Sequence, residues 1–372
     1  MCMTPRERLL SAIRGQPVDR VPLDLPGFQF DSEAGIEALE EPWRRDIARR
    51  HFPDSTFFVR VPNQINRKLV TPPGRISRRR EELADGTVRQ ITTIDTPGGP
   101  LTGISQYSRV SRQWGAIKEL VESYEDIEKI RSIPFELEED VRIPTPDELP
   151  PDFAERGILS TRISSPFVCV AGLMQYEWFL ELALTEPELI AELTEICRRR
   201  TLNVLEVLLA EPGIEYVWLG GSEWVTPPMA SPAIYDALVQ EQERSLIEYI
   251  HSRGDILVHV HCHGNVRHAL GRMIERGADY TEPVEPPPDG DITMAEAKQF
   301  ADGRIALGGN IEARVLYNES PDVVEAATRA AFEGGRQRFV LRTSESPSPL
   351  ITDREGANYL RMIDVWEKLS RE

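Results

Sequence analysis

The second half of the sequence alternates regularly between short apolar, β-branched runs and longer amphipathic stretches. Parallel strands joined by crossover helices produce this alternation, because each strand is buried on both faces and each helix on one. The runs span residues 157–163, 214–220, 255–261, 278–284, 304–310 and 338–344, and two earlier candidates span residues 18–25 and 55–61. The resulting eight strands predict an α/β fold, a (β/α)8 TIM barrel.

An open, doubly wound sheet has the same periodicity. Such sheets often carry a glycine-rich phosphate-binding motif directly after a strand. Neither GxGxxG nor GxxxxGK[ST] follows any of the eight runs, which favours the closed barrel.

The beginning of the chain predicts a helix before the first strand. Thr4 precedes Pro5, and a glutamate lies three residues after Thr4, which is the pattern of a capped helix start. Gly15 is expected to end this helix. Cap residues followed by proline or glutamate predict later helix starts at Thr185, Ser231 and Ser320.

Residues 68–118 have a different pattern, with short alternating runs separated by Pro-Pro-Gly, Asp-Gly and Gly-Gly-Pro. Such turns connect antiparallel strands. We therefore expect an antiparallel β insertion within a single barrel domain that spans residues 1–372.

The charge balance excludes several classes of partner. The chain carries 61 acidic and 43 basic residues, a formal charge of −18, which repels nucleic acid and anionic membranes. There is no apolar run long enough for a membrane span and no secretory signal at the N-terminus. We expect a cytoplasmic protein with a small-molecule substrate.

Four widely spaced cysteines without a CxxC pair argue against a disulfide framework or a structural zinc knuckle. Cys262 is expected on the outward face of its strand, buried between the sheet and the helices.

Polar residues follow several predicted strands. In a barrel they form the active site, because the loops after the strands meet at one end. Asp24, Glu223 and Glu282 are therefore candidate catalytic residues, and Trp224 and Asn310 are candidates for the substrate pocket. As alternatives, Asp24 could cap a turn, and tryptophans more often pack in the core.

Three of the six histidines lie within residues 259–265. With the two-residue period of a strand, His259, His261 and His263 share one face, where each ring needs a hydrogen-bond or metal partner. Two imidazoles and a neighbouring carboxylate make a site that suits zinc. We expect His261 and His263 to bind metal and His259 to line the pocket.

The carboxylate of this site is left open. Glu223, Glu282 and Glu345 all lie at strand ends, and each could instead pair with Arg162 or Arg342. A single strand histidine is also more often a hydrogen-bonded core residue than a ligand.

Five segments together resemble the uroporphyrinogen decarboxylase superfamily, whose members are barrels. The first is the opening MTPRERLLSAIRGQPVDRVPLDL, and the others are VWLGGSEWVTPPMASP, HVHCHGN, GNIEARVLYNESPDVVE and FVLRTSESPSPLITDREGANYLRMID. The arginine- and glycine-rich RQAGRY-like motif with which the decarboxylase receives its substrate has no counterpart here. The chain is more similar to the corrinoid-dependent methyltransferase and O-demethylase branch.

That branch holds zinc with a His-x-Cys-Gly motif and a later cysteine. Here His261 matches the histidine, His263 takes the cysteine position, and Glu345 lies near the later one. The resemblance therefore implies a zinc site made by His261, His263 and Glu345, harder than a thiolate site.

The activity that this resemblance implies is transfer of a methyl group from a methoxy- or amine-type donor to a corrinoid protein. The chain has no DxHxxG corrinoid motif, so cobalamin would arrive on a separate partner. A homodimer is also implied. Two alternatives are a cofactor-free decarboxylase or lyase, with Asp24 or an arginine polarising the substrate, and a non-catalytic small-molecule-binding subunit.

Overall fold

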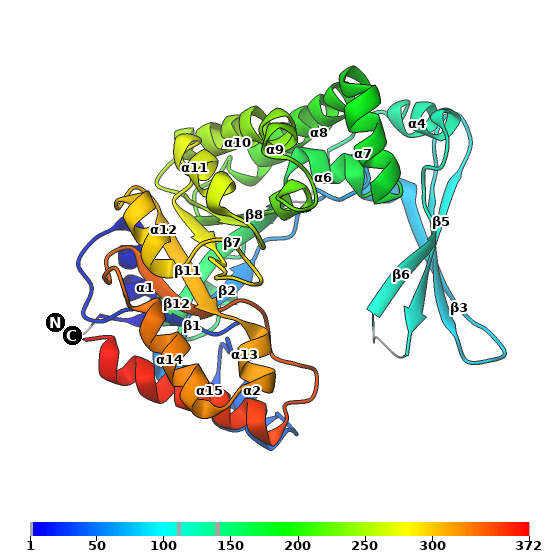
Figure 1. Cartoon of the computed structure of the whole chain (residues 1–372). Helices are drawn as coiled ribbons and strands as arrows, with labels where there is room; N and C mark the ends of the chain where they lie inside the picture. Colours follow the sequence, from blue (N-terminus) through cyan, green and yellow to red (C-terminus); the bar gives the residue numbers. More distant parts are fainter. Residues whose placement is uncertain (1–2, 110–112, 138–141, 372) are drawn as a thin grey trace.

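A computed structural model describes residues 3–109, 113–137 and 142–371. Eight parallel strands form one curled sheet in the order β1-β12-β11-β10-β9-β8-β7-β2 (Figure 1). They are β1 (Leu23–Asp24), β2 (Phe57–Arg60), β7 (Gly157–Ser164), β8 (Tyr216–Gly220), β9 (Leu257–His261), β10 (Tyr280–Glu282), β11 (Ala306–Ile311) and β12 (Phe339–Thr343). All eight predicted strands are confirmed.

The strand order is that of a TIM barrel opened at one seam. The first strand pairs with the last, and from β7 onward each strand pairs with the preceding strand of the same sheet. No ladder joins β1 to β2 among the residues that the structure describes. The predicted α/β barrel is therefore present as a curled sheet with one unpaired seam.

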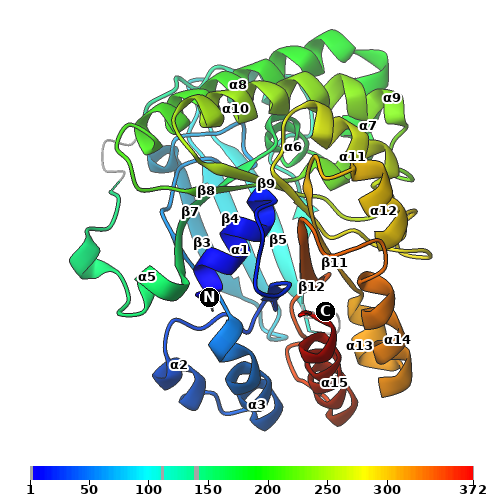
Figure 2. The ribbon, with the colours of Figure 1, turned by 90° about the vertical axis from the view of Figure 1, so that its left-hand side faces the viewer.

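The chain forms fifteen α-helices within the described residues, and most of them lie on the outside of the curled sheet (Figures 1 and 2). They are α1 (Pro5–Arg14), α2 (Glu33–Glu37), α3 (Pro42–His51), α4 (Tyr124–Arg131), α5 (Phe153–Arg156), α6 (Pro166–Ala171), α7 (Tyr176–Thr185), α8 (Pro187–Leu208), α9 (Pro232–Tyr235), α10 (Glu241–Ser252), α11 (Arg267–Glu275), α12 (Met294–Ala301), α13 (Ala313–Asn318), α14 (Pro321–Ala331) and α15 (Asp353–Leu369). None of the helices in the described ranges could cross a lipid bilayer.

The first helix has the predicted cap. The Glu7 backbone N–H donates to the Thr4 hydroxyl at 3.2 Å, and the Thr4 backbone N–H donates to the Glu7 carboxylate at 2.9 Å. Gly15 ends the helix with φ +73°, a conformation that glycine adopts without strain. Leu9, Leu10 and Ile13 of α1 are buried in an apolar cluster with inward side chains of the strands. This helix therefore closes the floor of the barrel.

The predicted insertion is confirmed as a separate antiparallel sheet. Its strands are β3 (Ile76–Glu82), β4 (Val88–Ile94), β5 (Leu101–Ser108) and β6 (Gln113–Lys118), paired in sequence order. Figure 1 shows this sheet standing away from the strands of the barrel.

One of the predicted helix starts is wrong. Thr185 is the last residue of α7, and its hydroxyl donates to the Glu181 carbonyl at 2.8 Å. The next helix, α8, begins at Pro187, which can occupy the first turn without losing a hydrogen bond. By contrast, Ser231 caps α9 as predicted, accepting from the Ile234 N–H.

Candidate metal and substrate site

The sheet register brings three polar side chains of β9 and β10 together. His259 and His261 lie two residues apart on β9, so both point to the inside of the barrel. Glu282 on β10 pairs in register with His261, and Tyr280 pairs with His259. Inward side chains of neighbouring strands meet when they share a register position.

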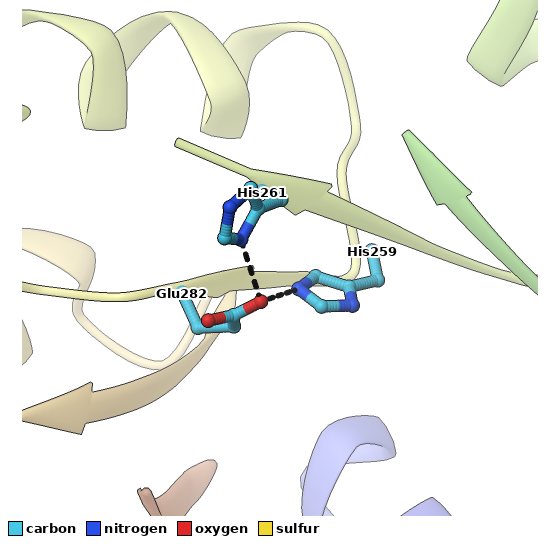
Figure 3. Close-up of side chains that lie close together, drawn as sticks. All are labelled: His259, His261 and Glu282. Carbon is cyan, nitrogen blue, oxygen red and sulfur yellow. Dashed lines mark hydrogen bonds and ion pairs between the residues drawn. The ribbon is translucent and has the colours of Figure 1, made fainter. Parts of the chain in front are cut away.

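His259, His261 and Glu282 form one compact cluster (Figure 3). Both imidazoles approach the same carboxylate oxygen: His259 Nε2 lies 2.9 Å from Glu282 Oε1, and His261 Nδ1 lies 2.8 Å from it. The three potential ligand atoms all lie within 4.8 Å of one another. Glu282 and His259 are buried, and His261 is partly exposed, so the cluster is reached from one side.

Glu282 is held in its charged form. Burial alone would raise the pKa of this carboxyl, but Arg342 and the two histidines lower it well below its ordinary value. Arg342 Nε lies 2.9 Å from Glu282 Oε2, on the side away from the imidazoles. The same arginine forms an ion pair with Asp24. Arg342 therefore occupies one carboxylate oxygen and leaves Oε1 to the histidines.

His259 is neutral at physiological pH. Burial lowers its pKa to about 4, although Glu282 opposes the shift. Its Nδ1 shares a hydrogen bond of 2.8 Å with the hydroxyl of Tyr216. Its Nε2 is buried and, despite the short distance to Glu282, has no aligned hydrogen-bond partner. A neutral imidazole whose second nitrogen is held by a hydrogen bond is the usual form of a metal-ligating histidine.

These residues fit a divalent metal ion. Two imidazole nitrogens and one carboxylate oxygen are a donor set that zinc accepts, with a further position open to substrate. Nε2 of His259 is buried without an aligned hydrogen-bond partner, and Oε1 of Glu282 is hydrogen-bonded to His261 Nδ1 at 2.8 Å. An ion bound by all three residues would replace that hydrogen bond and satisfy His259 Nε2.

Gly308 on β11 makes room for this cluster. A Cβ at this position would lie 2.1 Å from the Tyr280 hydroxyl and 2.8 Å from Cβ of Glu282, closer than atoms can approach. Glycine is therefore required here for Glu282 to face β9.

A cavity of about 530 Å³ lies beside the cluster, inside the curled sheet. Side chains from β1, β2, β7, β8, β9, β10 and β12 line it, and His259 is one of them. The polar lining residues include Asp24, Asp31, Arg60, Arg162 and Arg342, and the aromatic ones include Phe30, Phe57, Phe58, Tyr216, Trp218 and Tyr280. A small molecule in this cavity would contact His259 directly.

Residues 116–346 match the family model of uroporphyrinogen decarboxylase (URO-D). The chain belongs to the uroporphyrinogen decarboxylase family. No curated protein sequence matches it. Among solved structures, a methyltransferase from Methanosarcina mazei is similar with a TM-score of 0.60 at 15% identity, covering 98% of this chain and 99% of that one. A B12-independent methionine synthase from Shewanella sp. W3-18-1 has a TM-score of 0.43 at 10% identity, covering 80% and 77%.

The family match covers β7 to β12, which supply most of the site. The likeness to the Methanosarcina protein extends over nearly the whole chain and confirms the barrel fold.

Of the zinc ligands implied by the family resemblance, the structure places only His261 in the cluster. His263 lies beyond the end of β9, and its Nδ1 is 3.2 Å from Glu285 Oε1. Burial lowers the pKa of His263, but the adjacent Glu285 and other carboxylates outweigh this and raise it. Glu345 is exposed and lies outside the cluster.

The candidate catalytic residues are divided between two places. Glu282 lies in the cluster, and Asp24 lines the cavity, where it pairs with Arg342 and accepts from Gln29. The carboxylate of Glu223 instead accepts from the backbone N–H of Gly221 at 3.0 Å, in the loop after β8.

The predicted pocket residues are also divided. His259 lines the cavity, whereas Trp224 and Asn310 do not. Trp224 packs edge-on against Tyr176. Asn310 is buried at the register position beside Arg342. Cys262 is fully buried in the layer between the sheet and the helices, as the alternation of β9 predicts.

Sequence reasoning missed the remaining polar residues of the cavity wall. Tyr216 is an inward residue of β8, and Arg60 ends β2. Extending the two-residue period backward from each strand end would have identified them, because the inner face continues below the loops.

Proposed function

We propose that this protein is a zinc-dependent methyltransferase that moves a methyl group from a small methoxy- or amine-type donor to a separate corrinoid protein. The observation that carries the proposal is the cluster of His259, His261 and Glu282, with His259 at the cavity wall. A bound zinc ion would supply a Lewis acid that polarises the oxygen or nitrogen bearing the methyl group. The similarity of fold to a methyltransferase is compatible with this activity.

The protein's own residues prepare this site. Arg342 keeps Glu282 ionised, and burial keeps His259 neutral, so both ligand atoms have free lone pairs at neutral pH. Tyr216 orients the His259 ring through Nδ1. The aromatic wall of the cavity excludes water from the donor and holds its apolar part.

The zinc content of histidine variants tests the proposed ligand set. We would measure zinc by inductively coupled plasma mass spectrometry on protein purified without an affinity tag or chelator. Wild type should hold about one zinc per chain, as a mononuclear site requires. His261→Ala, His259→Gln and Glu282→Gln should lose it, whereas His263→Ala should retain it.

The matched control is His251→Ala, which removes a partly exposed histidine that pairs with Asp279 instead. It should retain zinc, and circular dichroism should show that every variant is folded. A folded wild type without zinc contradicts the proposal. Loss of zinc in His263→Ala together with retention of zinc in His259→Gln would instead support the ligand set that the family resemblance implies.

A transfer assay tests the reaction itself. Cob(I)alamin serves as the acceptor, and the visible spectrum reports methylcobalamin when a panel of methoxylated and methylated amine compounds is offered. We expect methylation by wild type that stops after chelation and returns with zinc.

A cofactor-free decarboxylase is the second candidate, favoured by Asp24 and Arg342 at the cavity wall. Carbon dioxide release that is unaffected by chelation would support it.

A further inference from the structure

Two arginines in the cavity wall do not belong to the cluster of His259, His261 and Glu282. Arg60 is the last residue of β2, and Arg162 lies near the end of the neighbouring strand β7. Both line the cavity, and both side chains are accessible from it. We infer that Arg60 and Arg162 form a carboxylate-binding subsite, and that the substrate is a small monocarboxylic acid. This inference rests on the proposed function only for the methyl transfer at the end of the substrate that does not bind the arginines.

Neither guanidinium has an anionic partner within the part of the chain that the structure describes. Arg342, the third arginine of the cavity, is neutralised by Asp24 and Glu282. Other arginines of the chain have partners of two kinds: Arg49 pairs with the carboxylate of Glu37, whereas Arg200 donates to backbone carbonyls. In a chain with 61 acidic and 43 basic residues, two unpaired arginines facing one cavity indicate a place kept for an external anion.

Arg162 is held ready for such a ligand. Its guanidinium lies 4.7 Å from the centre of the Trp218 ring, a stacking contact that fixes the plane of the group. Its backbone carbonyl accepts from Asn63 Nδ2 at 2.6 Å, which ties the strand to the loop after β2. A carboxylate would bind without a large loss of side-chain freedom.

The neighbouring charges also favour an anion. Burial lowers the pKa of Arg162, and the nearby Arg60 and Arg342 lower it further. Arg60 and Arg162 therefore repel each other, because neither forms an ion pair within the described residues, whereas Arg342 is paired with Asp24 and Glu282. A bound carboxylate would relieve this repulsion.

A monocarboxylate suits the cavity better than a phosphate. The fork of a guanidinium matches the two oxygens of a carboxylate in one plane. Asp24 and Asp31 also line the cavity, so a dianion would meet more repulsion than a monoanion. The aromatic residues Phe58 and Tyr216, whose ring centres lie 5.1 Å apart, provide an apolar surface next to the arginines.

The register sets the length of the substrate. Arg162 pairs with Trp218, and Trp218 pairs with His259, so two strand spacings separate the arginine from the metal cluster. Two spacings correspond to roughly 10 Å between the backbones. An acid with one ring or a short chain would fill this distance and place its far end at His259.

Ligand binding by metal-depleted protein tests the subsite separately from the metal. The probes are benzoate, neutral benzamide and inorganic phosphate, titrated by isothermal calorimetry into chelator-treated, folded protein. Wild type should bind one benzoate more tightly than either of the others. Arg60→Gln and Arg162→Gln should each weaken benzoate binding about tenfold, the usual effect of losing a charge-assisted hydrogen bond. Arg162→Lys, which keeps the charge, should weaken it less.

The matched control is Arg78→Gln, which removes an exposed arginine in β3, outside the cavity. It should leave benzoate binding unchanged. Three results would each overturn the inference: no benzoate binding by folded wild type, equal affinity for benzamide, or wild-type affinity in the Arg60→Gln, Arg162→Gln double variant. Phosphate binding tighter than benzoate would overturn the choice of carboxylate.

Failure of this subsite and failure of the proposed function are distinguishable. The arginine variants should retain zinc, and His261→Ala should retain benzoate binding while losing zinc. Benzoate binding without any zinc in wild type would contradict the methyltransferase proposal and leave the carboxylate subsite intact.

Discussion

Glu282 is fully buried and nevertheless ionised, because groups on two other strands, β9 and β12, compensate its charge. Arg342 supplies a full positive charge, and the two imidazoles of β9 supply hydrogen-bonding or metal-binding capacity. A carboxylate buried without such partners would take up a proton instead. The local chemistry of the site therefore depends on the residues around Glu282 as much as on its own identity.

Tyr216→Phe tests the role of the hydroxyl behind His259. When a metal binds Nε2, the Nδ1–H donates to the Tyr216 oxygen, and this bond of 2.8 Å fixes the ring. Loss of such a supporting bond typically weakens metal affinity by about 10- to 100-fold. We expect the variant to have a larger dissociation constant for zinc than wild type, measured by competition with a chromophoric chelator. Unchanged affinity in the folded variant would mean that packing alone positions His259.

Glu312 at the start of α13 gives a prediction for pH dependence. Burial and the adjacent carboxylates of Asp289 and Glu285 raise its pKa to about 8, despite the ion pair with Arg314. The folded protein therefore keeps a proton that the unfolded chain releases above about pH 4.5. This group makes stability fall as pH rises from about 4.5 to 8.

Glu312→Gln should remove that loss. The variant should be more stable than wild type at pH 8 by about 1 kcal/mol or more, with a smaller difference at pH 5. Urea unfolding at both pH values measures this, with the exposed Glu211→Gln as control. Equal destabilisation of the variant at both pH values would contradict this prediction. It would show that the hydrogen bonds of Glu312 stabilise the fold more than its charge destabilises it.

At the scale of elements, α1 contributes apolar packing against the strands of the barrel. The helix buries Leu9, Leu10 and Ile13 against the lower inward residues of the strands, such as Ile158 and Val340. The cavity borders this cluster, since Leu9, Tyr216 and Tyr280 belong to the cluster and also line the cavity. Ile13 is in the cluster but not in the cavity lining, so its packing contributes to stability without forming the site.

Ile13→Ala should therefore destabilise the protein without changing the site. Ile13 is fully buried, and its truncation should lower the free energy of unfolding by about 2–5 kcal/mol, measured by urea denaturation. The control is Leu184→Ala, since Leu184 is 67% exposed and its loss should cost about 0.5 kcal/mol or less. Loss of zinc from folded Ile13→Ala would contradict the prediction that Ile13 affects stability alone.

For the whole molecule, zinc bound as proposed by His259, His261 and Glu282 would raise the free energy of unfolding. A ligand that binds only the folded state at 100 times its dissociation constant adds about 2.7 kcal/mol. For a chain of this size such a gain raises the thermal midpoint by about a few °C. We expect chelation to lower the midpoint of wild type in differential scanning calorimetry, and added zinc to restore it.

Glu282→Gln is the control for this experiment. Its midpoint should not respond to chelator or zinc, because the carboxylate ligand is absent. An equal response in wild type and variant would place the stabilising zinc at another position in the protein.

The sequence by itself determined the architecture. Eight strands, the insertion and the capped first helix follow from local patterns, since hydrophobic period, turn residues and caps act within a few neighbours along the chain. The inward orientation of His259 and His261 and the outward burial of Cys262 also follow from the period of β9.

Only the tertiary structure decided which groups meet. Glu282 rather than Glu345 faces the histidines, because the register of β9 with β10 pairs it with His261. The ring of His263 lies 4.7 Å from that of His261, but its Nδ1 faces Glu285 in the loop after β10 rather than Glu282. Register and strand length depend on contacts between segments far apart in the sequence, so no local pattern could specify them.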